Sequence, residues 1–263
     1  MTPPPDILAL DFDGVLCDGM KEYFETSRRT YRRVWPGEPG PSDLLLDPFR
    51  RLRPVILSGW EMPLLLRAIV RGIPESDILR DWEAVRDGLA RAGEPAGDAV
   101  IAALKRTLDV VRSEWIAADP AGWLDENLPY CDPAEIRRTV AGAEQAVLVT
   151  TKEGVFARMV LDHWQIALAG VEGKETGTHK CENLRALIAA YTATRSRRPR
   201  VWFVEDRLET LRHVTTHPDL GDVGLFLAAW GYNTADTRAA VHSDARVRLL
   251  DLEQFRRGLS AWA

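Results

Sequence analysis

The sequence predicts an α/β fold, a doubly wound parallel sheet into which an all-helical domain is inserted. Short apolar runs typical of buried strands alternate with helical segments in the second half of the chain, and one such run stands near its start. Between the first and second runs lies a long stretch with helical periodicity and without the alternation typical of strands.

The first predicted strand, residues 7–10, stops at an acidic motif, Asp11-Phe12-Asp13-Gly14. Asp11 and Asp13 are two positions apart, so in an extended chain their side chains leave the backbone on the same side. Converging carboxylates repel each other unless a cation lies between them, and Mg²⁺ is the simplest hard cation with oxygen ligands. The alternative is an ordinary acidic turn, since Asp and Gly are common turn residues.

Residues 19–142 are predicted to form the inserted helical domain. The apolar residues of 62–70 predict a helix. A second helix is predicted after an expected N-cap at Asp98, where apolar residues recur along one face. Asp132-Pro133-Ala134-Glu135 is a helix start with a cap, a proline at the first helical position and a reciprocal acid.

An arginine-rich segment, residues 47–54, is predicted to be a loop within this domain. Arg51 and Arg53 are candidates for binding an anionic group of a substrate, because guanidinium groups match phosphate and carboxylate geometry. The alternative is a solvated surface.

Residues 1–18 and 143–263 are predicted to form the α/β core. Further strands are predicted at residues 146–149, 166–169, 201–204, 223–229 and 246–250, the last at an edge of the sheet, with helices over 153–163 and after Lys180 and a loop over 170–179. Parallel strands with right-handed crossovers place their carboxyl ends on one edge of the sheet, where ligands bind.

Other polar residues are predicted at the same edge. Thr150 ends the second strand, Asp206 follows the fourth, and Lys180 begins a helix. Thr151 competes with Thr150, and Lys174 competes with Lys180.

The motif Asp11-Phe12-Asp13-Gly14-Val15-Leu16 resembles the first motif of the haloacid dehalogenase-like (HAD) phosphohydrolase superfamily, in its phosphoglycolate-phosphatase-like branch. The resemblance implies a Rossmann-like core with a helical cap after the first motif. It implies that Asp11 is a nucleophile toward phosphorus and Asp13 a general acid and base. Thr150 would hold a phosphoryl oxygen and Lys180 would offset its charge.

The resemblance also implies Mg²⁺, held by Asp11, Asp206 and the backbone carbonyl of Asp13. The family commonly has Gly-Asp or paired acids in its fourth motif, whereas this chain has Glu205-Asp206. The second acid is therefore open between Glu205 and Glu209, and Glu209 is also explained as an acid at a helix N-terminus. The predicted substrate-binding residues are Gly14, Thr151, Arg51 and Arg53.

The resemblance implies a Mg²⁺-dependent phosphatase that hydrolyses a small phosphorylated metabolite through an aspartyl-phosphate on Asp11. Asp13 argues against dehalogenation, because a halide leaves without a proton. A phosphomutase with the same core, or a non-catalytic binding protein that keeps the fold, are the alternatives.

Composition agrees with an ordinary globular protein. The chain has 263 residues, 46% of them hydrophobic and 28% charged, and a net charge of -5, which gives no electrostatic footprint for nucleic acid or an anionic membrane. Three scattered cysteines indicate neither a disulfide framework nor a zinc site. No signal peptide or membrane span is recognisable, so a cytoplasmic location is expected.

Overall fold

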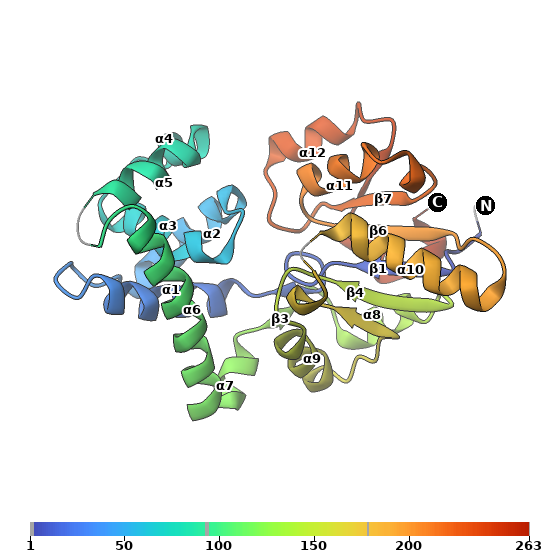
Figure 1. Cartoon of the computed structure of the whole chain (residues 1–263), viewed down its shortest axis with the longest axis horizontal. Helices are drawn as coiled ribbons and strands as arrows, with labels where there is room; N and C mark the ends of the chain where they lie inside the picture. Colours follow the sequence, from blue (N-terminus) through green and yellow to red (C-terminus); the bar gives the residue numbers. More distant parts are fainter. Residues whose placement is uncertain (1–2, 93–94, 178, 263) are drawn as a thin grey trace. The chain divides into compact units, whose positions relative to one another are not determined.

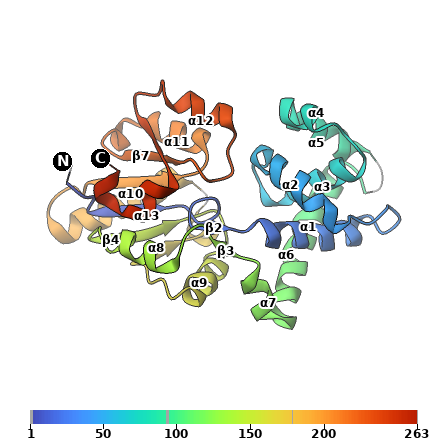
Figure 2. The ribbon, with the colours of Figure 1, turned by 180° about the vertical axis from the view of Figure 1, so that it is seen from behind.

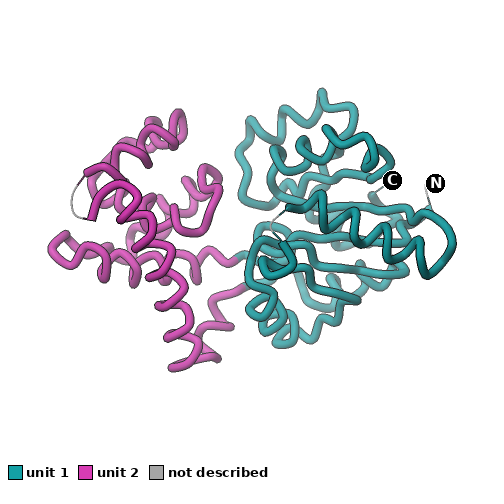
Figure 3. Tube along the Cα trace, viewed as in Figure 1, with its two compact units in different colours: residues 1–18, 128–263 teal, residues 19–127 magenta. Residues whose placement is uncertain are grey.

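The computed structural model describes residues 3–92, 95–177 and 179–262, and the chain divides into two compact units (Figure 3). Residues 1–18 and 128–263 form the α/β unit, and residues 19–127 form the helical unit. Each unit is described by itself.

The α/β unit contains a six-stranded parallel sheet, which confirms the predicted fold class. Its strands stand in the order β5-β4-β1-β6-β7-β8. Their bounds are β1 Ile7–Leu10, β4 Gln145–Val149, β5 Gly170–Glu172, β6 Val201–Glu205, β7 Gly224–Ala228 and β8 Val247–Leu250. The strands are added outward from β1 first through β4 and then, on the other side, through β6. The carboxyl end of β1 is therefore a topological switch point, where α/β sheets bind ligands.

Helices cover both faces of this sheet, and their bounds are α8 Pro133–Val140, α9 Gly154–His163, α10 Lys180–Arg195, α11 Leu208–Thr215, α12 Ala235–Val241 and α13 Leu252–Arg257. α10 crosses one face in Figure 1, and α8 and α13 lie on the opposite face in Figure 2. Alternate strand residues reach the two faces, as strand geometry requires. Ala9 and Phe203 pack in the core with Leu184 of α10, whereas Trp202 stacks on Trp262.

The predicted start of the core after residue 142 differs from the structure, in which the chain returns to the α/β unit at Leu128. Two contacts account for the earlier return. β3 (Leu128–Pro129) pairs antiparallel with β2 (Cys17–Asp18). α8, which begins with the predicted capping box, packs on α13, and the Thr139 hydroxyl donates a 2.7 Å hydrogen bond to the Phe255 carbonyl.

The strand predicted at residues 166–169 is wrong, because these residues connect the turn after α9 to β5, which begins at Gly170. The amide of Ile166 donates to the Leu161 carbonyl. The amide of Ala169 makes the first hydrogen bond to β4, at the Ala146 carbonyl, and paired strand residues begin with Gly170 opposite Val147. β5 therefore lies inside the segment that was predicted to be a loop.

The helical unit consists of α1 Met20–Val34, α2 Leu46–Leu52, α3 Met62–Val70, α4 Glu75–Arg80, α5 Trp82–Arg91, α6 Asp98–Ala118 and α7 Pro120–Asp125, with short 3₁₀ turns between some of them. α1 packs against α3 and α6. The fully buried Glu22 of α1 accepts hydrogen bonds from Arg112 of α6 and from Trp123 of α7, so buried charge is paired inside this unit.

Two local predictions in this unit are wrong. Residues 47–54 are not a loop: α2 occupies most of them, because Phe49 and Leu52 turn inward and are fully buried. Asp98 is the first residue of α6 and Gly97 its N-cap, since Gly97 adopts a positive φ that glycine tolerates. Of the helices in the described ranges, none combines the length and the apolar character needed to cross a membrane.

Candidate active site

Three acidic side chains meet at the carboxyl ends of β1 and β6. Asp11 follows β1, Glu205 is the last residue of β6, and Asp206 comes next. Parallel pairing sets Leu10 beside Val204, so the residues that follow the two strands become neighbours. Asp11, Glu205 and Asp206 are all buried, and one carboxylate oxygen of each lies within 4.8 Å of the others. The structure thus brings together the aspartates that the sequence predicts to share a metal.

Lys180 is the cation of this cluster. Its Nζ lies 2.7 Å from Oδ1 of Asp11 and 3.0 Å from Oε2 of Glu205, and it donates a 2.7 Å hydrogen bond to the Val149 carbonyl. Lys180 reaches these groups because it is the first residue of α10. The competing candidate, Lys174, pairs with Glu153 and is half exposed.

Burial and charge shift the pKa values of the cluster. Burial raises the pKa of Asp11 to about 7, and the nearby Glu205 carboxylate adds to this effect, while Lys180 opposes it. Burial also raises the pKa of Glu205. Burial alone would lower the pKa of Lys180, but the two carboxylates raise it, so the lysine stays charged. Lys180 pairs with two of the three buried carboxylates, so when all three are ionised the cluster carries net negative charge.

Thr150 lies on the other side of β1, at the end of β4. It is buried, its amide donates to the Glu172 carbonyl, and its hydroxyl accepts a 3.2 Å hydrogen bond from the Lys152 amide. Thr151 is exposed. The buried hydroxyl at this edge of the sheet is therefore that of Thr150.

Lys152 is a site residue that sequence reasoning missed. Its Nζ lies 3.2 Å from Oδ1 of Asp13 and above the ring of Phe12, and its side chain is 5% exposed. A charged end buried beside an acid is unusual for a lysine that serves only solubility. Its position three residues after the end of β4, at the edge where Asp13 was already expected, was the available signal.

Asp206 accepts hydrogen bonds from residues 232 and 233, which sequence reasoning also missed. The amide of Tyr232 donates a 2.8 Å hydrogen bond to Oδ2 of Asp206, and the Asn233 side chain donates to its carbonyl at 3.0 Å. Gly14 has φ +85°, and a Cβ on Gly14 or Gly231 would overlap the Asp206 side chain. The structure therefore gives Gly14, predicted to bind substrate, a steric reason to be glycine.

Of the two candidates for the second acid of the predicted metal site, Glu205 lies in the acidic cluster and Glu209 does not. Glu209 stands in the first turn of α11, its side chain is 73% exposed, and its nearest cation is Arg207 at 3.8 Å. Glu205 is buried inside the cluster.

Comparison with known proteins supports the fold. No protein-family profile matches the sequence, and no curated protein matches it either. Among solved structures, a candidate phosphoglycolate phosphatase from Lactobacillus delbrueckii aligns with a TM-score of 0.61 at 12% identity, over 97% of this chain and 98% of that one. A haloacid dehalogenase-like hydrolase from Streptococcus pneumoniae aligns with a TM-score of 0.53 at 11% identity, over 93% of each chain. The chain has the HAD-like fold.

A third structure, protein tyrosine kinase A from Mycobacterium tuberculosis, aligns with a TM-score of 0.57 at 18% identity, over 97% of this chain and 98% of that one. Its name gives it an activity other than phosphatase. At these identities the likeness concerns the fold, and one fold can carry different chemistries that its site residues decide.

Arg51 and Arg53, predicted to bind substrate, lie in the helical unit and are engaged there. Arg51 forms an exposed ion pair with Glu75, with Nη2 2.6 Å from Oε1. The Arg53 guanidinium lies 5.2 Å from the ring centre of Tyr23, a cation–π contact.

The residues of the acidic cluster fit a hard divalent cation. Asp11, Glu205 and Asp206 offer only carboxylate oxygens, which are the ligands that Mg²⁺ prefers. Burial, and after it the Glu205 carboxylate, raise the pKa of Asp11, and Lys180 only partly offsets them. A cation at this place would stabilise the ionised carboxylates.

Proposed function

We propose that this chain is a Mg²⁺-dependent phosphatase that hydrolyses a small phosphorylated metabolite. The observation that carries the proposal is the buried cluster of Asp11, Glu205, Asp206 and Lys180 at the switch point of a HAD-like sheet. The phosphatase names of structural neighbours support it. The expected cytoplasmic location stays a prediction.

Asp11 is the proposed nucleophile. Its attack on phosphorus would give an aspartyl-phosphate and free the alcohol, so that one difficult displacement becomes two easier ones. Mg²⁺, when bound by Asp11, Asp206 and the Asp13 carbonyl, would neutralise charge on the phosphoryl oxygens. Lys180 and the Thr150 hydroxyl would donate hydrogen bonds to the same oxygens.

Asp13 is the proposed general acid and base. It would protonate the leaving oxygen and then take a proton from the water that attacks the aspartyl-phosphate. Lys152, 3.2 Å from Oδ1 of Asp13, would orient this carboxyl group. Thr151, Arg51 and Arg53 remain proposed contacts to substrate.

The test measures release of inorganic phosphate from p-nitrophenyl phosphate with and without Mg²⁺. Asp11→Asn removes the nucleophile and should lower turnover by about 10³-fold or more. Glu209→Gln is the matched control, because this exposed acid lies outside the cluster, and its turnover should equal that of the wild type. Mg²⁺-dependent turnover that survives in Asp11→Asn would overturn the assignment.

A further inference from the structure

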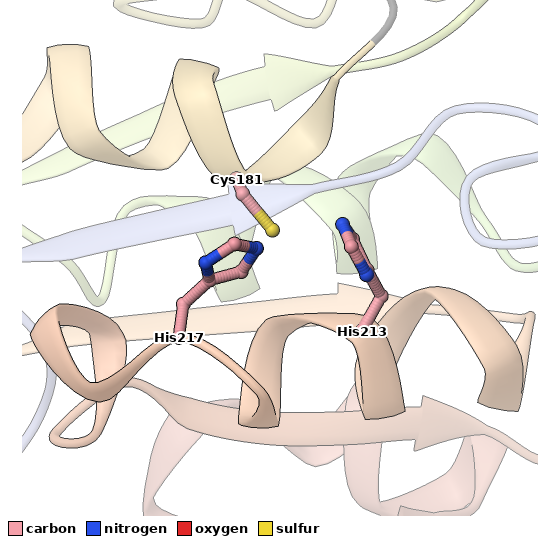
Figure 4. Close-up of side chains that lie close together, drawn as sticks. All are labelled: Cys181, His213 and His217. Carbon is pink, nitrogen blue, oxygen red and sulfur yellow. The ribbon is translucent and has the colours of Figure 1, made fainter.

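A second cluster of metal-binding side chains lies between α10 and α11. Cys181 extends from α10 toward two imidazole rings, His213 of α11 and His217 of the turn that follows it (Figure 4). One ligand atom of each residue lies within 4.8 Å of the others. Cys181 directly follows Lys180 in the chain, yet this cluster shares no residue with the Asp11 cluster.

The chemistry of this cluster differs from that of the acidic site. A thiol and two imidazoles are the ligands that Zn²⁺ takes in proteins, whereas Mg²⁺ prefers oxygen. Tetrahedral coordination at the usual Zn–S and Zn–N lengths places ligand atoms roughly 3.3–3.6 Å apart. The three ligand atoms of this cluster, within 4.8 Å of one another, are close to that spacing.

The two histidines have a spacing that suits a shared ion. His213 and His217 are four positions apart where α11 ends, and their ring centres lie 5.0 Å from each other. Within the described part of the chain, neither ring donates or accepts a side-chain hydrogen bond. Their ring nitrogens are therefore not committed to another protein group.

The cysteine of this cluster is buried, whereas its two histidines reach solvent. Cys181 is 4% exposed and packs in the core with Leu208 and Leu211 of α11. His213 is exposed and His217 is half-buried, so an ion can enter from the solvent side. The nearby Arg185 is neutralised by two hydrogen bonds to Asp219, at 2.6 and 3.0 Å, which limits its repulsion of a cation.

We propose that Cys181, His213 and His217 bind one Zn²⁺ ion that joins α10 to α11. This site goes beyond the proposed phosphatase activity. Cys181 directly follows Lys180, and α11 follows Glu205 and Asp206 along the chain. The ion would therefore link the segment that supplies Lys180 to the segment that supplies Glu205 and Asp206. Its main effect would be on the stability of the fold.

Cobalt is the spectroscopic probe, because Co²⁺ bound by a thiolate has a ligand-to-metal charge-transfer band in the near ultraviolet that oxygen ligands do not give. Titration of the whole chain with Co²⁺, in excess Mg²⁺ to occupy the acidic cluster, should give this band at one ion per chain. Cys181→Ser should abolish the band, and Cys131→Ser, which changes a cysteine outside the cluster, should keep it. Absence of the band in the wild type, or its persistence in Cys181→Ser, would overturn the proposal.

His213→Gln provides a second test that avoids the core. Because His213 is exposed, the variant should fold and keep its Mg²⁺-dependent phosphatase turnover, measured without zinc. Competition with a chromophoric chelator should show Zn²⁺ binding weakened about 10- to 100-fold, and Zn²⁺ should raise the Tm of the wild type more than that of the variant. Equal Zn²⁺ affinity of the two proteins would contradict the site, whatever the outcome for phosphatase activity.

Discussion

Nζ of Lys180 lies 2.7 Å from Oδ1 of Asp11, and both side chains are about nine-tenths buried. The pair joins the first residue of α10 to the residue after β1. An ion pair so far from water depends on both members, because removing one leaves an uncompensated buried charge. The proposed nucleophile and its cation are therefore one electrostatic unit.

Lys180→Met should lower phosphatase turnover by about 10²- to 10³-fold, because it removes a fixed donor for the phosphoryl charge and leaves Asp11 and Glu205 facing each other. Lys174→Met is the matched control, since Lys174 is half exposed and pairs only at the surface with Glu153. Initial rates at saturating Mg²⁺ measure both. Equal losses in the two variants would contradict the role of Lys180.

Lys152→Met should lower kcat by about 10- to 100-fold, the usual range for a hydrogen bond to a charged group. Because Lys152 acts through Asp13, the loss should be larger for an alkyl phosphate, whose leaving oxygen needs a proton, than for p-nitrophenyl phosphate. Asp13→Asn should show the same dependence on the leaving group. A loss that is the same for both substrates would show that Lys152 does not act on proton transfer.

Gly14→Ala should weaken Mg²⁺ activation by about 10- to 100-fold, the range found when a group that orients a ligand is disturbed. The added Cβ overlaps the Asp206 carboxylate, and φ of +85° at this position strains any other residue. The Mg²⁺ concentration that gives half-maximal turnover measures the effect.

Gly88→Ala is the control for this substitution. Gly88 lies in α5 with no atom within 4 Å of an added Cβ. It should leave Mg²⁺ activation unchanged and raise the free energy of unfolding by about 0.5–1 kcal/mol. If the two variants respond alike to Mg²⁺, the contact between Gly14 and Asp206 has no part in metal binding.

The helical unit should become less stable in acid, because the stabilising contribution of the ionised Glu38 is lost there. Burial by itself would raise the pKa of Glu38, but hydrogen bonds from Arg67, Arg71 and Tyr31 lower it from 4.5 to about 2. Because the folded-state pKa lies below the unfolded one, the stabilisation is complete above pH 4.5 and is lost as the pH falls toward 2.

Glu38→Gln measures this contribution. Near pH 7 the free energy of unfolding should fall by about 1–2 kcal/mol, because the buried Arg67 side chain loses the carboxylate that pairs with it. The difference from wild type should shrink between pH 4.5 and 2. Urea unfolding at pH 7, 5 and 3 tests both statements. Glu83→Gln, at a side chain that is 80% exposed, should show no such trend, and a constant difference across this range would refute the role of Glu38.

Much of the fold could be predicted because its signals are local. The apolar runs of β1, β4 and β6, the capping box before α8 and the helix that follows Lys180 are each visible within a few residues. The errors arose where tertiary packing overrode local composition. The arginine-rich segment folds as α2 because Phe49 and Leu52 are buried in the helical unit. The chain returns to the α/β unit before the predicted residue 143 because α8 packs on α13.

The sequence by itself determined β1, β4 and β6, the polar residues that follow them and hence the candidate residues Asp11, Asp13 and Thr150, since hydrophobic patterning acts along the chain. Only the tertiary structure decided which partners those residues have. Strand order and parallel register set Glu205 rather than Glu209 beside Asp11 and bring Lys152 to Asp13. Such contacts join residues far apart in the chain, and no local pattern encodes them.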